Sequence, residues 1–315
     1  RPDRAASVAG NAAWLEQRLA GAGPPLVIDG GMGTELQKRG VPMDGRVWSA
    51  TANLTHPDAV RAAHEAYIGA GAEVIITNTF SAARHMLEPA GLGDRVREIN
   101  LNAAQAARLA RANAATGPVA IAGSICEWTT AGDARWNSPR AVGAAAREQA
   151  RLLVEAGVDL IALEMCERLE YTVAVVEAAL DTGLPVWIGV SARVFPELDY
   201  VSVFDLPELD FETLVQGVAG YPAAMLAIMH TPVPDVARSW EIVKRYWDGP
   251  VGIYPESGYF TMPNWNFVDI IEAAALAAAA RTWVDDGARM VGGCCGLGPE
   301  HIAALHRAFG RASES

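Results

Sequence analysis

The sequence predicts a single-domain α/β protein with the fold of a (β/α)8 TIM barrel. Three segments repeat one pattern of helix end, tight turn and apolar strand, and their turn glycines are Gly71, Gly157 and Gly287. The glycines are 86 and 130 residues apart, which is two and three units of about 43 residues, the length of one strand with its helix and loops. Eight short apolar runs fit this spacing, and eight strands that alternate with helices indicate a barrel. An open doubly wound sheet is the alternative, but its edge strands should be more polar.

The expected elements follow one another along the whole chain. The eight strands are expected at residues 26–29, 74–78, 119–124, 160–164, 186–191, 225–230, 251–254 and 289–293. Between them lie alanine-rich segments with helical periodicity, such as residues 57–71 and 138–157, which begin with proline or serine and end with glycine. We expect an N-terminal helix within residues 1–24, the barrel at 25–310 and a tail at 311–315. The proline- and acid-rich stretch 192–211 follows a strand, so it is predicted to be a long βα loop and not a linker.

Composition and charge exclude several classes of protein. Hydrophobic residues make up 51% and charged residues 20% of the 315 residues, which excludes a disordered chain. The formal net charge of −12 argues against nucleic acid and anionic membranes as partners, so a small molecule is expected. The sequence has no apolar run of about 18 residues and no apolar signal segment, which predicts a cytoplasmic protein without membrane spans. The oligomeric state stays open.

Polar side chains and all four cysteines collect at the predicted strand ends, where barrel enzymes build their active sites. In chain order these segments are Asp29-Gly30-Gly31-Met32-Gly33-Thr34, Thr77-Asn78-Thr79, Ser124-Ile125-Cys126, Glu164-Met165-Cys166, Ser191, His230, Tyr254-Pro255-Glu256 and Gly293-Cys294-Cys295-Gly296. Four cysteines are too few for a disulfide framework, and the adjacent pair is poorly placed for an ordinary bridge. Metal binding or thiol chemistry is therefore expected here.

The adjacent cysteines Cys294 and Cys295 indicate a metal site. The glycines on both sides permit a tight backbone that turns two neighbouring thiols toward one centre. His230, at the end of the sixth predicted strand, is a third ligand suited to zinc. A Cys2His set leaves a fourth position open, as in catalytic zinc sites. The alternative is a pair of inert buried cysteines beside a hydrogen-bonded histidine.

Two carboxylates, Asp29 and Glu164, end the first and fourth predicted strands, where they can face an ammonium group. Asp29 has an alternative role as the N-cap of the following helix. An aspartate at this strand end would repel phosphate, and the glycines do not fit GxGxxG, so no dinucleotide site is expected. Cys126 and Cys166 are predicted to be packed small side chains, with metal ligation or nucleophilic chemistry as the alternative.

Four segments together resemble the homocysteine S-methyltransferases, a family of zinc-dependent (β/α)8 enzymes. They are DGGMGTELQKRG at residues 29–40, the stretch from VWSATANL to TNTF at residues 47–80, VGIYPESG at 251–258 and GARMVGGCCGLGPEHI at 287–302. The resemblance runs from residue 25 to 308, nearly the whole chain.

The resemblance implies transfer of a methyl group from a sulfonium or quaternary ammonium donor to the sulfur of homocysteine, as in methionine biosynthesis. It implies that Cys294 and Cys295 bind zinc, which keeps the homocysteine sulfur as thiolate. Asp29 and Glu164 then act as catalytic residues that orient the amino-acid end, and Trp48 faces the cationic donor through its ring. The substrate-binding set at this mouth is Asp29, Gly30, Gly31, Thr34, Trp48, Asn78, Thr79, Glu164 and Glu256.

The resemblance also bears on the donor. Betaine-using members carry a C-terminal extension for oligomerisation, and little follows Gly310 here. S-methylmethionine or S-adenosylmethionine is therefore the expected methyl donor.

The sequence departs from the family pattern at the predicted mouth. The family has a cysteine in an Asn-Cys pair at the end of the sixth strand, where this chain has Met229 and His230. Glu256 replaces the asparagine of a YPNSG-like segment, and Cys126 and Cys166 stand where the family usually has glycine or threonine. A neutral imidazole in place of a thiolate makes the metal a stronger Lewis acid and its bound sulfur a weaker nucleophile.

These departures keep three functions open. The first is a zinc-dependent S-methyltransferase that acts on homocysteine or a related thiol. The second is a zinc- or thiol-dependent hydrolase or lyase in which Glu164 or Glu256 is the base. The third is a non-catalytic barrel that binds a metabolite.

Overall fold

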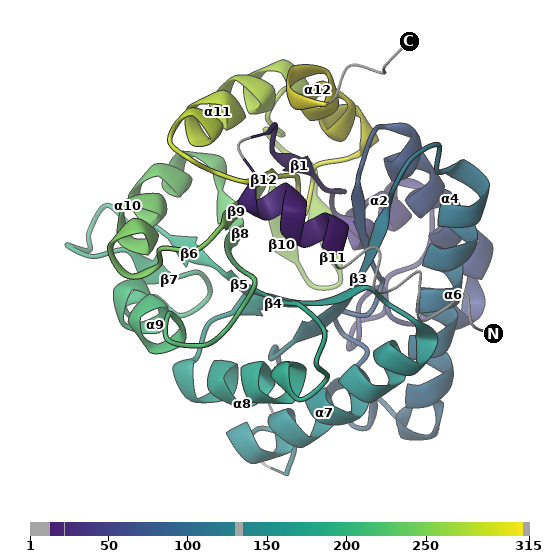
Figure 1. Ribbon diagram of the computed structural model, residues 1–315. Coiled ribbons are helices and arrows are strands. Elements are labelled where there is room, and N and C mark those ends of the chain that lie inside the picture. The colour runs from purple at the N-terminus through teal and green to yellow at the C-terminus, as the bar shows by residue number, and fades with distance from the viewer. Residues whose placement is uncertain (1–12, 22, 130–134, 311–315) are drawn as a thin grey trace.

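The eight predicted strands form a closed parallel barrel in the computed structural model, which describes residues 13–21, 23–129 and 135–310 (Figure 1). The barrel strands are β1 (Leu26–Val27), β2 (Val74–Ile76), β3 (Ala120–Cys126), β4 (Leu160–Cys166), β5 (Val186–Val190), β8 (Met225–Pro232), β9 (Val251–Glu256) and β12 (Met290–Val291). Their order is β1-β12-β9-β8-β5-β4-β3-β2. A parallel bridge between Ile28 and Val74 joins the first strand to the last one in this order. The predicted barrel is confirmed, and the open sheet is excluded.

Helices surround the barrel and connect its strands. They are α2 (Met32–Lys38), α3 (Ala52–Thr55), α4 (Pro57–Gly69), α5 (Arg84–Leu87), α6 (Val96–Ala114), α7 (Pro139–Ala156), α8 (Leu169–Leu180), α9 (Phe211–Val218), α10 (Val236–Tyr246), α11 (Ala273–Asp285) and α12 (Pro299–Phe309). Helix α7 illustrates how serine and glycine in the sequence mark the two ends of a helix. The Oγ of Ser138 accepts a hydrogen bond from the backbone N–H of Ala141, and Gly157 ends the helix at φ 82°, a left-handed conformation that favours glycine.

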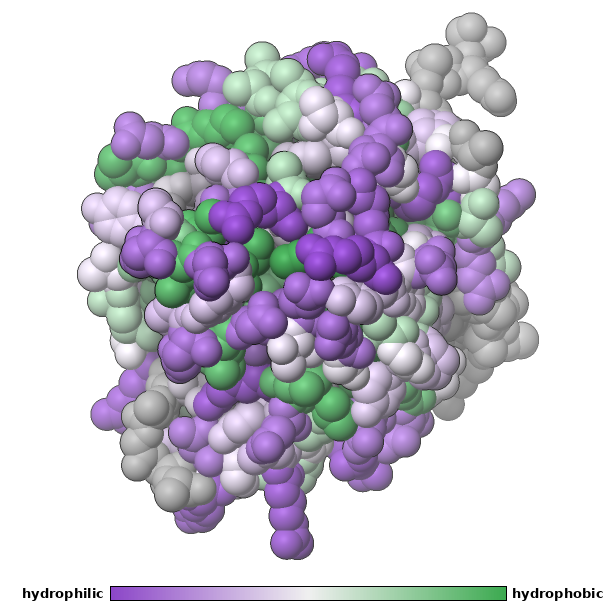
Figure 2. All heavy atoms as spheres, turned by 90° about the vertical axis from the view of Figure 1, so that its left-hand side faces the viewer, coloured by the Kyte–Doolittle hydropathy of each residue, from purple (hydrophilic) through white to green (hydrophobic). Residues whose placement is uncertain are grey.

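Alternation along the strands separates two apolar cores. Leu160 and Ala162 of β4 belong to the cluster that fills the barrel, whereas Ile161 and Leu163 belong to the larger cluster between the strands and the helices. The helices turn hydrophilic side chains outward, as Figure 2 shows for the side of the barrel formed by α9 and α10, where apolar patches are small and scattered. No helix of the described residues is long and apolar enough to span a membrane.

The N-terminal segment covers the end of the barrel at which the strands begin (Figure 1). Residues 13–20 are helical, and the buried side chains of Leu15 and Leu19 join the cluster inside the barrel. Arg18 of this segment pairs with Glu73, which directly precedes β2. The division into residues 1–24, 25–310 and 311–315 remains a prediction, because residues 1–12, 22 and 311–315 lie outside the described part.

Two small hairpins stand at the opposite end, where the strands finish. The predicted βα loop 192–211 contains β6 (Ala192–Arg193) and β7 (Ser202–Val203), which pair antiparallel. A second hairpin, β10 (Tyr259–Thr261) and β11 (Asn264–Asn266), follows β9. Both contribute walls to the cavity described next.

Candidate active site

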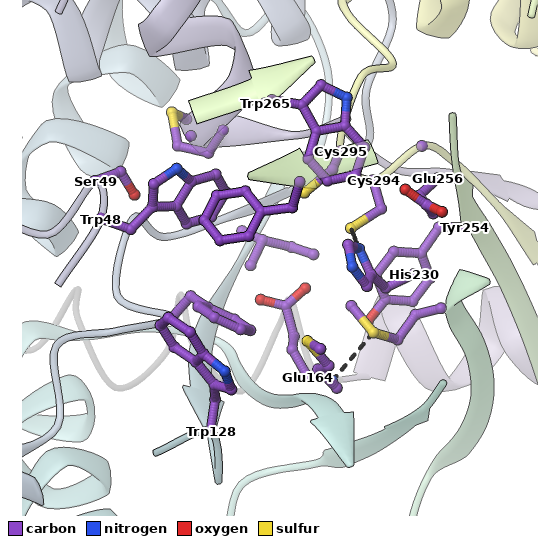
Figure 3. A pocket seen from close by; sticks show the side chains of 18 of the residues that line it. Trp48, Ser49, Trp128, Glu164, His230, Tyr254, Glu256, Trp265, Cys294 and Cys295 are labelled. Carbon is purple, nitrogen blue, oxygen red and sulfur yellow. Dashed lines mark hydrogen bonds between the residues drawn. The ribbon is translucent and has the colours of Figure 1, made fainter. Parts of the chain in front are cut away.

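Three potential metal ligands meet at the C-terminal mouth of the barrel. The ligand atoms of His230, Cys294 and Cys295 all lie within 4.8 Å of one another, and Nδ1 of His230 is 3.5 Å from Sγ of Cys294 (Figure 3). Around one tetrahedral zinc ion, with bonds of about 2.3 Å to sulfur and 2.0–2.1 Å to nitrogen, ligand atoms are about 3.5–3.8 Å apart. The spacing of the three ligand atoms is therefore compatible with such an ion after small adjustments.

Close packing of two glycine-rich loops places the cysteines. A Cβ atom on Gly31 would lie 2.7 Å from the carbonyl oxygen of Cys294, so only glycine permits this approach. The hydroxyl of Thr34 donates to the carbonyl of Gly31 at 3.0 Å and accepts from the backbone N–H of Gly296 at 3.2 Å. The loop after β1 thus holds the cysteine loop after β12 in place.

A break in strand alternation turns His230 into the mouth. The pairing of β8 with β9 shifts register between Met229 and Pro232, and His230 has φ 46°. As a result Met229 and His230, consecutive in sequence, both line the cavity. The pairing of β4 with β5 shifts in the same way after Leu163, and Met165 there has φ 55°. Bulges and strained backbone of this kind are typical of functional sites.

Glu164 and Asp29 form an acidic patch below the mouth. Glu164 lines the cavity, and its Oε2 accepts a hydrogen bond from the hydroxyl of Ser124. Burial raises the pKa of Glu164 to about 7, although the Ser124 hydrogen bond opposes the shift. In Asp29, Oδ2 accepts from the backbone N–H of Ile76 at 2.7 Å, and Oδ1 has no hydrogen-bond partner among the described residues. Burial raises the pKa of Asp29 well above its usual range, so this patch suits a cationic group that would restore both charges.

The surroundings of Cys294 favour its protonated form. The neighbouring Cys295 and burial raise the pKa of Cys294 well above its usual range, although His230 opposes the shift. A thiol must lose its proton to bind a metal ion. The charge of the ion would therefore be needed to hold the Cys294 thiolate in this buried place.

Aromatic rings form a continuous wall around the cavity. Ring centroids are 6.1 Å apart for Trp128 and Phe80, 6.2 Å for Phe80 and Trp48, 5.9 Å for Trp48 and Phe260, and 6.4 Å for Phe260 and Trp265. We call these five residues the aromatic wall. It ends at His230, whose ring is 5.9 Å from that of Trp265 (Figure 3).

The predicted site residues fall into two groups. Those that line the cavity are Gly30, Trp48, Asn78, Glu164, His230, Glu256, Cys294 and Cys295. The others do not line it but contact residues around it; they are Asp29, Gly31, Thr34 and Thr79. The hydroxyl of Thr79, for example, donates to the carbonyl of Ser124 at 2.7 Å. The side-chain amide of Asn78 forms hydrogen bonds with Ser49 and Asn53.

The structure also distinguishes between the alternative roles of Asp29 and of the cysteines Cys126 and Cys166. Gly31, and not Asp29, is the N-cap of α2. Cys126 and Cys166 are buried and are not part of the His230 group, which agrees with packed side chains.

Several cavity residues were missed by the sequence reasoning. They are most of the aromatic wall, together with Arg193, Phe204 and Asp205 of the loop after β5. The aromatic-rich segment YFTMPNWNF at residues 259–267 is a signal that could have indicated the wall. Glu256 was expected, and it is buried with Oε2 unpartnered among the described residues.

Comparisons with known proteins agree with this geometry. The sequence profile of the homocysteine S-methyltransferase family matches residues 26–309. Homocysteine S-methyltransferase YbgG of Bacillus subtilis is 28% identical over 310 residues, which is 92% of this chain and 96% of that protein. Betaine–homocysteine S-methyltransferase 1 of Bos taurus is 28% identical over 314 residues, 90% of this chain and 72% of that one.

A solved structure supports the same assignment. The homocysteine methyltransferase MmuM from Escherichia coli, in its metallated form, superposes with a TM-score of 0.73 at 25% identity, covering 94% of this chain and 98% of that one. Fold, cysteine loop and sequence thus point to one group of enzymes over nearly the full length. The chain belongs to the homocysteine S-methyltransferase family and is a methyltransferase.

Proposed function

We propose that the protein transfers a methyl group from a sulfonium donor to the sulfur of homocysteine, with zinc held by His230, Cys294 and Cys295. The observation that carries the proposal is the convergence of these three ligands within 4.8 Å beside a cavity walled by aromatic rings. The family match and the metallated MmuM structure support it. The zinc ion would supply the positive charge that keeps the acceptor sulfur deprotonated at neutral pH.

The chain's own residues orient the acceptor. The ammonium group of homocysteine would face Glu164. Burial raises the pKa of this side chain, so a nearby cation would stabilise its charged form. Asp29 interacts electrostatically with Glu164, and a bound ammonium group would favour the charged form of both carboxyl groups. Two fixed ends, the sulfur and the ammonium group, leave the acceptor one orientation, which is the main way such a site accelerates transfer.

The aromatic wall suits the donor. A sulfonium ion is attracted to the faces of tryptophan and phenylalanine rings, and the rings exclude water. In the transfer, a bond forms between the homocysteine sulfur and the methyl carbon while the sulfonium carbon–sulfur bond breaks. The negative sulfur and the positive donor both become neutral thioethers, so a dry cavity favours the change.

The size of the cavity favours a small donor. Its volume is about 250 Å³, which is below the range of about 300–1,000 Å³ usual for drug-sized ligands. Homocysteine would occupy part of this volume, so the smaller S-methylmethionine is favoured over S-adenosylmethionine.

Metal content and methyl transfer test the proposal together. Homocysteine with deuterium on its carbon chain distinguishes, by mass, methionine made from the acceptor from methionine left by the donor. We expect the parent protein to contain zinc and to form labelled methionine, and Cys294→Ser to lose zinc and about 100-fold or more of the rate.

Cys166→Ser is the matched control, because Cys166 is buried outside the ligand group and should retain both properties. Zinc-loaded parent protein that forms no labelled methionine from either sulfonium donor would contradict the proposed reaction. Equal zinc content in Cys294→Ser and the parent would contradict the site.

A further inference from the structure

We propose that the loop after β5 forms a subsite for the amino-acid head group of the donor, in which Arg193 binds the α-carboxylate and Asp205 the α-ammonium. The inference rests on the proposed methyl transfer and adds which end of the donor is recognised, and by which residues. No comparison assigns a role to either position.

Arg193 is held in place by its neighbours. In the β6–β7 hairpin, Arg193 pairs with Ser202, whose hydroxyl donates to the Arg193 carbonyl at 3.0 Å. The next backbone N–H, that of Val194, donates to Asp235 at 3.0 Å. The guanidinium stacks on Phe204, with Cζ 4.4 Å from the ring centroid. A stacked guanidinium on a paired strand is preorganised for a planar anion.

Arg193 and Asp205 carry opposite charges, and neither forms a salt bridge with another described residue. At longer range Arg193 opposes the rise in the pKa of Glu256, and Asp205 helps to raise the pKa of His230. Arg193 is the only lysine or arginine among the described cavity-lining residues, and Asp205 lines the same cavity. Within the described residues, no carboxylate oxygen lies within 4.0 Å of the Arg193 guanidinium, and no cationic nitrogen lies that close to the Asp205 carboxylate. Two opposite charges on one loop, each without a salt bridge among the described residues, match the zwitterion of an α-amino acid, which offers a carboxylate and an ammonium on one carbon.

The position of the loop assigns this subsite to the donor and not to homocysteine. Glu164 and His230 belong to β4 and β8 and hold the acceptor at the ends of the barrel strands. Arg193 lies three residues beyond the end of β5, in the hairpin layer that also supplies Phe260 to the aromatic wall. A donor that delivers its methyl group to a sulfur held at the strand ends must lie on the outer side of that sulfur, which is this layer. Its sulfonium would face the aromatic wall and its head group the β5 loop.

Binding and kinetics with a masked carboxylate test the subsite. The ligands are S-methylmethionine and its methyl ester, which keeps the sulfonium and the ammonium but lacks the carboxylate charge. Arg193→Met retains an apolar stem over Phe204 and removes the guanidinium. We expect it to raise the Kd and KM of S-methylmethionine about 10- to 100-fold, to change those of the ester less than about twofold, and to leave the KM of homocysteine unchanged. Arg193→Lys should recover part of the loss, and Asp205→Asn should weaken both ligands.

The exposed Arg140 on α7 supplies the matched control, because Arg140→Met makes the same change of charge outside the cavity lining. Equal weakening of acid and ester by Arg193→Met, or a rise in the KM of homocysteine in place of the donor, would overturn the subsite. So would unchanged binding, which would limit the role of Arg193 to its longer-range interaction with carboxylates such as Glu256. Calorimetric binding to the zinc-loaded protein keeps the two proposals apart: a parent that binds S-methylmethionine without transferring its methyl group contradicts the reaction and not the subsite.

Discussion

His230 sets the charge of the ligand group. Two thiolates and a neutral imidazole carry one negative charge less than three thiolates, so sulfur bound beside them is less electron-rich. His230→Cys restores a three-thiolate group of the kind that the family resemblance implies. We expect unchanged zinc content and a faster transfer from S-methylmethionine to homocysteine, measured with the labelled acceptor. If the variant keeps its zinc but loses all transfer, the imidazole is an acid or base for the native reaction, and the ligand role is wrong.

A second histidine makes the stability depend on pH. His64 on α4 is fully buried, and neither ring nitrogen has a hydrogen-bond partner among the described residues. Burial lowers the pKa of His64 from 6.5 to about 3. Between these values the unfolded chain binds a proton that the folded protein does not, so stability is full above pH 6.5 and falls as the pH decreases. Each pH unit in this window is worth about 1.4 kcal/mol.

His64→Leu should remove this dependence. Relative to the parent, we expect the free energy of unfolding at pH 5 to gain about 2 kcal/mol more than at pH 8, as measured by urea denaturation at both values. His85, whose burial lowers its pKa to about 4, contributes equally to both proteins and cancels in the difference. The same substitution at the exposed His56 is the control. An identical pH profile for parent and His64→Leu would show that His64 takes up protons in the folded state.

At the residue scale, the sequence predicted chemistry better than side-chain direction. Cysteines and a histidine at strand ends identified the ligand group, because few other arrangements place those residue types at a barrel mouth. Strict alternation from Met225 would nevertheless turn His230 toward the helices, and only the β8 bulge turns it inward. The strand-end positions of Thr34 and Thr79 predict contact with substrate, but their hydroxyls bind backbone groups: Thr34 those of Gly31 and Gly296, and Thr79 that of Ser124 in β3.

At the element scale, strands and helices were predictable where local signals and packing agree. Each barrel strand is an apolar run buried on both faces, and α7 begins and ends at the residues that its serine and glycine indicate. The β6–β7 and β10–β11 hairpins were not predicted, since each strand has only two or three residues. These hairpins carry Arg193, Phe260 and Trp265, and Phe204 directly follows β7, so the elements least visible in sequence form the outer wall of the cavity.

At the scale of the whole molecule, one end of the barrel carries the cavity and the other carries contacts that stabilise the fold. Loops at the end where strands finish form the cavity, and the N-terminal helix closes the end where strands begin. Arg289, which precedes β12, donates to the backbone carbonyls of Arg18 and Leu19, and Glu73 binds both Arg18 and the backbone N–H of Val27. These contacts fasten the helix to three strand starts. The arrangement follows the general separation of function and stability in this fold.

This separation predicts a variant that loses stability and keeps its site. Leu15 is only 2% exposed and packs into the barrel cluster, so Leu15→Ala should lower the free energy of unfolding by about 2–5 kcal/mol. Leu109 on α6 is 41% exposed, and the same substitution there should cost less than about 1 kcal/mol. Below the melting temperature, the KM values of Leu15→Ala for donor and acceptor should equal those of the parent, because the N-terminal helix and the cavity lie at opposite ends of the strands. Altered KM values without a loss of stability would mean that the N-terminal helix acts on the active site through the barrel interior and does not merely close it.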